Sequence, residues 1–431
     1  MPTPLRLPRL PSHARNRLHV LVLHNRYRQN GGEDAVVRSE IQLLRSQSVK
    51  VTEFALTNDA EAGSWTGLVQ LGVAAIWSQS SHRRVKELCA DVRPDIAHVH
   101  NFWMRLSPSV HYACREAGVA TVQTLHNFRL LCLRADFLRD GQVCEDCLGH
   151  TPWQGVMHRC YRDSVSASAS VAGMIATHRL AGTWRSHVDA FIALSEHSKS
   201  RFIRGGIPKQ RLFVRPNFLE DTGVSTPLPS GSNLVLFVGR LSEEKGVQLL
   251  LGAWREVRNR ARSVLCIIGD GPLRGRLERQ AQDYGFPPGE VQFTGALPYS
   301  EVMRQIGNAR ALVLPSLCFE NCPRTLLEAF CNGRPAVVPD HGSLDELVRD
   351  GQTGLKFAAG NEYSLSETLL KLLSPSAAVN TWGANARLEY LLRYTPKASF
   401  EKLMQIYQFA LTQNCNRAEA FNHPGQLEEN S

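Results

Sequence analysis

The chain has 431 residues, of which 43% are hydrophobic and 21% are charged, a composition typical of globular proteins with enough length for two domains. It contains no run of about 18 uninterrupted apolar residues, so no membrane-spanning helix is expected. The formal net charge of +9 lies entirely in the first half, because residues 1–230 hold 28 Lys and Arg against 19 Asp and Glu, and the remainder holds 21 of each kind.

The basic first half indicates an anionic partner. A basic residue near an anionic membrane contributes roughly 1 kcal/mol of attraction, so a membrane surface or an anionic acceptor is expected. No nucleic-acid partner is expected, because no RNP, zinc-finger or helix-turn-helix pattern accompanies the charge. Residues 1–17 carry four Arg and no long apolar core, which predicts a disordered basic leader rather than a secretory signal. The expected location is the cytoplasm, including peripheral attachment to the inner face of the plasma membrane.

Short apolar strands alternate with helical stretches through residues 18–222, which predicts a first domain built on a doubly wound parallel sheet. The strands are expected at Leu18–Leu23, Val51–Leu56, Ile96–Val99, Ala120–Leu125, Ala190–Leu194 and Leu212–Val214. Such sheets bind their ligands outside the carboxyl ends of the strands. The residues that follow the strands are therefore the candidates for a site.

Three features follow these strands. After the first strand, a loop carries Gly31 and Gly32 ahead of a helix expected from about Ala35. A strand, a glycine-bearing loop and a helix together bring backbone amides up to an anion, although a simple turn has the same composition. His100 and His126 follow the third and fourth strands, and a lone histidine at such a place is more often structural than functional.

A cysteine-rich insertion is expected at 129–163. Cys132, Cys144, Cys147 and Cys160 fall there with spacings of 11, 2 and 12 residues, and the turn from Asp136 to Gly141 predicts a hairpin. Four thiols at such spacing could hold a structural Zn tetrahedrally, or could be buried as small apolar groups. Since no secretory signal is expected, thiols are favoured over disulfides.

The second half, residues 223–395, repeats the alternation after a Pro- and Gly-containing linker. Its strands are expected at Leu234–Val238, Val264–Ile268, Val291–Phe293, Ala311–Leu314, Ala336–Val338 and Leu355–Phe357. Arg240 and Lys245 follow the first of these and could neutralise a diphosphate leaving group without a metal ion. The glycines at 269, 271 and 275 do not have the spacing of a dinucleotide fingerprint, so no NAD site is predicted.

Glu320 and Glu328 lie eight residues apart, before and inside a helix expected over Arg324–Asn332. Two turns separate them, so both side chains can point toward one ligand. Ionised carboxylates accept hydrogen bonds from hydroxyls, and the amides at the helix start, including that of Asn321, suit phosphate or sugar oxygens. A solvated pair of surface acids would have the same spacing.

The run from Leu314 to Gly333 resembles the Glu-x7-Glu motif of retaining glycosyltransferases of family 4, which have the two-domain GT-B architecture. The segments Phe237–Gly246, Ile268–Pro272 and Val291–Gly295 resemble that family in the same order. The resemblance covers essentially the whole second half. It implies two Rossmann-like domains facing a cleft and a helix over 396–413 that crosses back to the first domain, followed by a flexible tail at 414–431.

The resemblance also implies roles for individual residues. Arg240 and Lys245, with the Gly31–Gly32 loop facing them, would bind the donor diphosphate. Glu328 would bind the ribose, Glu320 and Asn321 the donor sugar, and His126 would lie beside the anomeric carbon. The implied reaction is metal-independent, retaining transfer of a hexosyl group from a nucleoside-diphosphate-sugar to a hydroxyl, such as that of a polyprenyl-diphosphate-linked glycan in surface polysaccharide or glycoconjugate synthesis.

Two other classes of function stay open. One is a GT-B-like enzyme of different chemistry, such as a sugar-nucleotide epimerase or a phosphorylase. The first would be expected to place acid and base carboxylates in the cleft and the second a cofactor lysine, and neither is identifiable in the sequence. The other is a non-catalytic protein that binds a nucleotide sugar.

Overall fold

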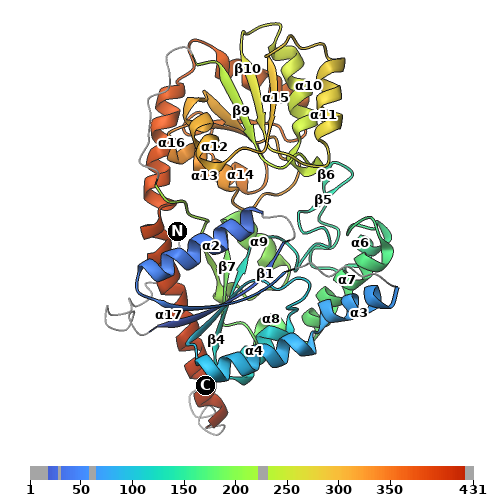
Figure 1. Ribbon diagram of the computed structural model, residues 1–431, viewed down its shortest axis with the longest axis vertical. Coiled ribbons are helices and arrows are strands. Elements are labelled where there is room, and N and C mark those ends of the chain that lie inside the picture. The colour runs from blue at the N-terminus through green and yellow to red at the C-terminus, as the bar shows by residue number, and fades with distance from the viewer. Residues whose placement is uncertain (1–17, 28–30, 58–64, 222–231, 423–431) are drawn as a thin grey trace.

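A computed structural model describes residues 18–27, 31–57, 65–221 and 232–422 of the protein. The expected leader at 1–17, residues 222–231 of the linker expected at 220–232, and residues 423–431 of the expected tail lie outside these ranges. The described chain forms two lobes, each built on a six-stranded parallel sheet with helices on both faces (Figure 1). The doubly wound organisation predicted for both halves is therefore confirmed.

The first sheet has the strand order β2-β1-β3-β4-β7-β8. Its strands are β1 (His19–Arg26), β2 (Lys50–Thr57), β3 (Ile96–Asn101), β4 (Ala120–Leu125), β7 (Ala190–Ala193) and β8 (Leu212–Val214). The longer helices of this domain are α2 (Gly32–Ser46), α3 (Trp65–Ile76), α4 (Gln79–Val92), α5 (Ser109–Glu116), α7 (Val165–Leu180) and α9 (Glu196–Arg204), with the short α8 (Thr183–Ser186) and a 3-10 turn, η1 (Lys209–Arg211).

Both faces of the first sheet are buried, as the apolar runs of its strands require. In β1, Leu21 and Leu23 pack into one core while Val20 and Val22 pack into the core on the opposite face. The second of these cores also contains Leu403 and Tyr407, which come from the last helix of the chain. The carboxyl-terminal helix is thus part of the first domain's core.

The insertion between β4 and β7 contains the hairpin of β5 (Leu138–Arg139) and β6 (Gln142–Val143), followed by α6 (Trp153–Met157). The hairpin confirms the turn predicted between Asp136 and Gly141. The insertion also reaches the second domain. The amide of Phe319 donates to the carbonyl of Asp136 at 3.2 Å, and Arg134 Nη2 lies 3.3 Å from Glu243 Oε2.

The second sheet has the order β11-β10-β9-β12-β13-β14, which is the dinucleotide-binding order 3-2-1-4-5-6. Its strands are β9 (Leu234–Val238), β10 (Val264–Ile268), β11 (Val291–Gly295), β12 (Ala311–Val313), β13 (Ala336–Pro339) and β14 (Gly354–Phe357). The helices are η2 (Glu243–Lys245), α10 (Val247–Val257), α11 (Arg274–Asp283), α12 (Tyr299–Asn308), α13 (Arg324–Cys331), α14 (Gly342–Leu347), α15 (Glu362–Leu373) and α16 (Val379–Arg393).

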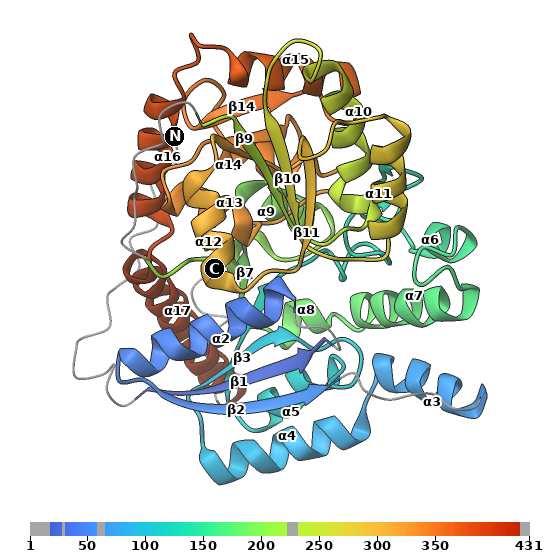
Figure 2. The ribbon, with the colours of Figure 1, turned by 45° about the horizontal axis from the view of Figure 1, so that its top comes forward.

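The last helix, α17 (Pro396–Asn422), crosses from the second domain and packs along the first (Figures 1 and 2). It continues past residue 413, where the sequence predicts its end. Polar contacts with the first domain account for the extension, because Asn414 Nδ2 donates to the carbonyl of Gly118 at 2.7 Å and Arg417 pairs with Asp189. No helix in the described part of the chain is long and apolar enough to cross a membrane.

Candidate active site

A cleft of about 1090 Å³ is lined by residues of both domains. It contains almost all of the residues singled out from the sequence. The first domain contributes Gly31, Gly32 and His126, and the second contributes Arg240, Lys245, Glu320 and Asn321. The two groups are more than 100 positions apart in the chain, and the facing carboxyl ends of the two sheets bring them together.

The second-domain wall of the cleft is built on an ion pair. Lys245 Nζ lies 2.6 Å from Glu320 Oε1, and Ser316 Oγ donates to the same oxygen at 2.9 Å. Burial disfavours both charges, but each partner outweighs that cost for the other. The pKa of Lys245 is therefore raised and that of Glu320 is lowered. Both groups are charged at neutral pH and ready to face a ligand that carries phosphates and hydroxyls.

The position of Lys245 depends on the glycine that follows it. Gly246 has φ of +66°, and a Cβ atom there would lie 2.0 Å from the carbonyl oxygen of Pro315. Only glycine can therefore let η2 approach the loop after β12 so closely. The amide of Leu317 donates to the carbonyl of Glu244 at 2.9 Å across this contact. The approach brings Lys245 to Glu320.

Glu328 is arranged differently from its partner in the motif. It does not belong to the cleft lining, and its buried carboxylate lies 3.7 Å from Arg324 Nη2, one helical turn away. Burial raises the pKa of Glu328, although Arg324 opposes the rise. Arg324 itself lines the cleft. A ligand in the cleft would meet Arg324 before it meets Glu328.

Asn321 joins the two walls of the cleft. Its Nδ2 donates to the backbone carbonyl of His126 at 2.7 Å, and its Oδ1 accepts a hydrogen bond from Ser198 Oγ. The side chain is therefore engaged with the first domain, and the residue lines the cleft from the loop before α13. The contact also fixes the distance between His126 and Glu320.

The glycine loop is held by the helix that it precedes. α2 begins at Gly32, earlier than predicted, because Asp34 lies in the first turn and caps it. Asp34 Oδ2 accepts a hydrogen bond from the amide of Gly31 at 3.1 Å, and Oδ1 lies 2.8 Å from His24 Nε2 at the end of β1. Gly31 and Gly32 thus present a fixed helix start to the cleft.

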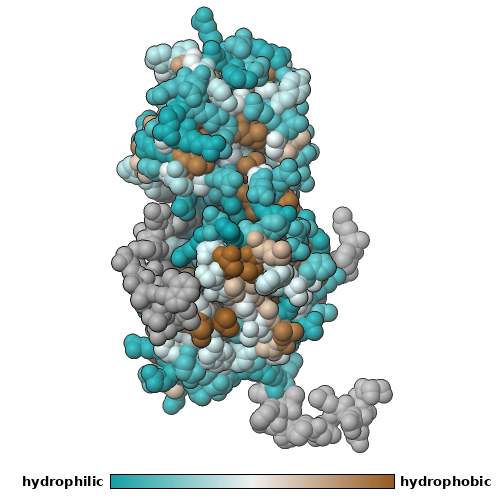
Figure 3. Space-filling model, turned by 90° about the vertical axis from the view of Figure 1, so that its right-hand side faces the viewer, coloured by the Kyte–Doolittle hydropathy of each residue, from teal (hydrophilic) through white to brown (hydrophobic). Residues whose placement is uncertain are grey.

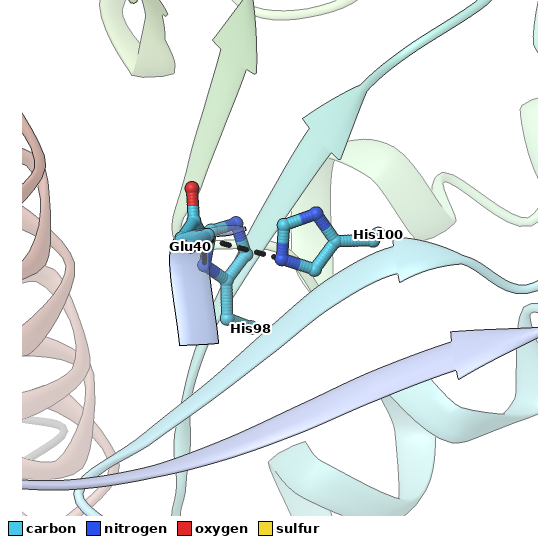
Figure 4. Close-up of side chains that lie close together, drawn as sticks. All are labelled: Glu40, His98 and His100. Carbon is cyan, nitrogen blue, oxygen red and sulfur yellow. Dashed lines mark ion pairs between the residues drawn. The ribbon is translucent and has the colours of Figure 1, made fainter. Parts of the chain in front are cut away.

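A buried network that includes Glu40, His98 and His100 (Figure 4) contacts His126. His126 Nε2 lies 2.9 Å from His100 Nδ1, and His100 Nε2 lies 3.2 Å from Glu40 Oε1. His98 Nδ1 lies 3.0 Å from the same Glu40 oxygen, and Arg215 pairs with the other one. The network connects the cleft to the carboxyl end of β8. It makes His100, which sequence reasoning ranked below His126, the direct support of His126.

Electrostatics keep the two histidines near the cleft neutral. Burial, reinforced by neighbouring histidines, lowers the pKa of His100 to about 4 and that of His126 well below its ordinary value. Burial also opposes the charge of Glu40, but Arg215 and the histidines hold the pKa of Glu40 well below its ordinary value. Nε2 of the neutral His126 is engaged with His100, so Nδ1 is left to donate or accept one hydrogen bond. The neutral ring adds no positive charge to the cleft.

Glu40, His98 and His100 form the only set of three candidate metal ligands in the described part of the chain whose ligand atoms all lie within 4.8 Å. Their arrangement is explained without a metal. Arg215 already supplies a cation to Glu40, and His98 Nδ1 also lies 2.8 Å from Tyr407 Oη. All three residues are buried in the core behind the site.

Sequence reasoning missed Glu33, Glu40 and Arg324. Glu33 lines the cleft beside the two glycines, and its position in the first turn of a helix would have been the available signal. Glu40 is an acid inside an otherwise apolar stripe of α2, between Val37 and Leu44. Such a buried acid requires a partner, but the partner's identity depends on the tertiary structure.

The second domain resembles proteins of known families. Residues 220–389 match the model of the family described as glycosyl transferases group 1. Among curated proteins, the chain is 29% identical over 176 residues to the alpha-D-kanosaminyltransferase of Streptomyces kanamyceticus, which covers 41% of the chain and 45% of that protein. It is 28% identical over 229 residues to the amylovoran biosynthesis glycosyltransferase AmsK of Erwinia amylovora, which covers 51% and 56%. The matched region thus spans about half of each relative's length.

Solved structures match over nearly the whole chain. HepE of Anabaena, in complex with UDP and glucose, aligns with a TM-score of 0.59 and 16% identity, covering 94% of this chain and 100% of that one. Sucrose-phosphate synthase from Thermosynechococcus elongatus aligns with a TM-score of 0.65 and 18% identity over the same shares. The fold is GT-B. The cleft described above is accordingly the interdomain cleft of a GT-B protein, and α17 is its crossover helix.

The low pKa of His100 predicts a loss of stability in acid. In the unfolded chain His100 would take up a proton near pH 6.5, but in the folded protein it does so only near pH 4. Because the unfolded state then binds more protons, the melting temperature should fall as the pH is lowered from 6.5 to 4. His100→Gln should show a shallower fall. The exposed His158→Gln variant is the control, and equal slopes in the parent and His100→Gln would contradict the assignment.

Proposed function

We propose that this protein is a retaining glycosyltransferase that moves a sugar from a nucleoside-diphosphate-sugar to a hydroxyl acceptor. The observation that carries the proposal is the Lys245–Glu320 pair, which faces the Gly31–Gly32 loop and His126 across one cleft. A cation beside a carboxylate matches a donor that carries both phosphate and hydroxyl groups. The match to group 1 glycosyltransferases and the names of the two curated relatives support the same class.

The roles follow from the charge of each group. Arg240 and Lys245, with the amides of the glycine loop, would hold the diphosphate and stabilise it as it leaves. Glu320 and the Asn321 amide would bind the donor sugar, and Arg324 with Glu328 would meet the ribose. In our proposal these cations neutralise the diphosphate without an active-site metal ion.

The proposed reaction is a front-side substitution. The bond from the anomeric carbon to the phosphate oxygen breaks, the bond to the acceptor oxygen forms on the same face, and the acceptor proton passes to the departing phosphate oxygen. His126 lies beside the reacting face as a neutral imidazole. Within the described part of the chain, Glu33 is the only first-domain carboxyl in the cleft lining, and burial raises its pKa to about 8. A carboxyl that is neutral at pH 7 is a poor nucleophile, which favours this route over a double displacement.

A screen of nucleotide sugars by thermal unfolding tests the donor site. At about 100 times its Kd, the correct donor should add about 2.7 kcal/mol and raise the melting temperature by about 3 °C. Glu320→Ala should remove the part of the shift that depends on the sugar and keep the part given by the plain nucleotide. Lys245→Ala should reduce both parts.

Exposed Glu256→Ala on α10 is the matched control and should behave as the parent. Equal sugar-dependent shifts in the parent and Glu320→Ala would refute the role of Glu320. Conversion of the donor to another sugar nucleotide without an acceptor would instead favour the epimerase alternative. Binding without any transfer or donor hydrolysis would favour a non-catalytic protein.

We also propose that the four cysteines of the insertion bind a structural Zn. All of them are free thiols, and all four line one cavity of about 20 Å³ together with Leu133 and Phe137. Burial, and then the neighbouring thiols, raise the pKa of Cys160 to about 11, which shows that the thiols lie close to one another. The thiols would have to rotate inward to reach tetrahedral Zn–S distances.

Metal analysis of the purified full chain tests this proposal. We expect about one Zn per chain, lost in the Cys144→Ser, Cys147→Ser double variant, which should also melt at a lower temperature. Replacing Cys89 and Cys114, buried thiols outside the insertion, by Ala gives the control for loss of thiols in general. A metal-free parent whose melting temperature does not change with added Zn or chelator would contradict a metal site.

We propose finally that the acceptor is held at an anionic membrane and is a lipid-linked glycan. Figure 3 shows apolar surface gathered on the face of the first domain that carries α6 and α7. We call this the apolar face. The exposed large apolar residues of these two helices and of α3 are Val73 of α3, Trp153 and Met157 of α6, and Val165 and Leu180 of α7. Arg159 and Arg162 are exposed in the segment between α6 and α7, which places basic groups next to the apolar ones.

Flotation with vesicles tests the apolar face. The parent should float with phosphatidylcholine vesicles that contain anionic phosphatidylglycerol, less so with pure phosphatidylcholine, and less so at high salt. Trp153→Ser with Met157→Ser should abolish most of the flotation. Leu392→Ser, at an exposed apolar residue of α16 in the other domain, is the matched control. Flotation that is insensitive to salt and to the double substitution would count against the proposal.

A further inference from the structure

Glu33 occupies a place in the cleft that the roles above leave unused. It belongs to the first turn of α2, next to Gly31 and Gly32, and it lines the same wall as His126. The diphosphate that the proposed function brings to the glycine loop would therefore lie against this carboxyl. An ionised carboxylate there would repel the ligand that the neighbouring amides attract.

Both hydrogen bonds to the Glu33 side chain are made to the same carboxyl oxygen. Tyr27 Oη donates to Oε2 at 3.0 Å, and Asn127 Nδ2 donates to the same oxygen at 3.4 Å. The other oxygen, Oε1, is buried and has no hydrogen-bond partner. A neutral carboxyl group accepts through its carbonyl oxygen and donates through its hydroxyl. Because both donors contact Oε2, the proton of a neutral Glu33 belongs on Oε1.

We propose that Glu33 binds the donor as a neutral acid, turning Oε1 from its buried position toward the cleft so that it donates a hydrogen bond to an anionic oxygen of the nucleoside diphosphate. This assignment rests on the proposed function, and it adds a specific ligand from the first domain to the cations of the second. It also makes donor binding dependent on pH. The neutral form attracts the diphosphate, and the ionised form repels it.

The surroundings of Glu33 support the neutral form at pH 7. Burial raises its pKa to about 8, and the hydrogen bonds from Tyr27 and Asn127 oppose the rise without reversing it. The groups facing it from each neighbouring element are Tyr27 after β1, Asp34 in α2, and Arg129 and His126 after β4, with Arg240, Lys245, Glu320 and Arg324 across the cleft. The acid is therefore mostly protonated at pH 7 and mostly ionised at pH 9.

The size of the effect follows from the population of the neutral form. If only that form binds, the apparent Kd rises in inverse proportion to the protonated fraction, which is about nine tenths at pH 7 and about one tenth at pH 9. The ionisation of Glu33 alone should therefore lower the affinity for a nucleoside diphosphate about tenfold between pH 7 and pH 9.

Calorimetric titration with UDP, GDP and ADP tests the assignment without knowledge of the acceptor. Glu33→Gln keeps the shape and supplies a permanent donor, so it should bind the preferred diphosphate at pH 7 within about threefold of the parent. From pH 7 to pH 9 the parent should lose about tenfold more affinity than Glu33→Gln. Glu33→Ala should bind weakly at both values. Titrations in two buffers of different ionisation enthalpy at pH 8.5 should show proton uptake by the parent beyond that of Glu33→Gln.

Glu256→Gln on α10 is the control and should follow the parent at every pH. Comparison within each pH removes the titration of the nucleotide itself, because it is common to all variants. Parallel loss of affinity in the parent and Glu33→Gln would overturn the assignment while leaving the proposed function standing. If none of the three diphosphates binds to either protein at pH 7, the proposed function fails, and the assignment fails with it.

Discussion

The buried carboxylate of Glu40 is the constraint on which the rest of the molecule depends. It pairs with Arg215 beyond the end of β8, and Arg215 Nε in turn donates to the carbonyl of Ser399 in α17 at 3.2 Å. The other carboxylate oxygen contacts His98 and His100 in β3. The Glu40 carboxylate thus connects α2, which follows the glycine loop, to the segment before the linker, to the crossover helix α17 and to His100, which contacts His126. Removing either partner of such a buried pair costs about 3–5 kcal/mol, because a charge is left without compensation.

The two walls of the cleft differ in charge. On the first domain, burial keeps His126 neutral, and it raises the pKa of Glu33 to about 8. On the second domain, Lys245 and Glu320 hold each other ionised, and Arg240 is exposed beside them. The ionised groups of the cleft thus belong mainly to the second domain, and the first domain contributes uncharged hydrogen-bonding groups.

Contacts across the cleft fix its width without closing it. Asn321 reaches the backbone of His126, and the insertion reaches Phe319 through Asp136. Both contacts involve the short loop that carries Glu320. Movement of one domain against the other would therefore shift the carboxylate relative to the imidazole. The cysteine-rich insertion contacts the same loop through Asp136. Its rigidity therefore affects the position of that loop in the cleft as well as its own fold.

The sequence by itself determined the strands, the order of both domains and most of the cleft residues, because apolar runs have a fixed period and parallel strands deliver their carboxyl ends to one edge. It also indicated Lys245 and Glu320 by residue type and position. Only the tertiary structure decided that Glu328 pairs with Arg324 and lies outside the cleft lining, that His100 supports His126, and that Glu33 lines the cleft. These outcomes depend on burial and on partners that lie more than 20 residues away or on a neighbouring helical turn, and a pattern of residues along the chain does not contain those distances.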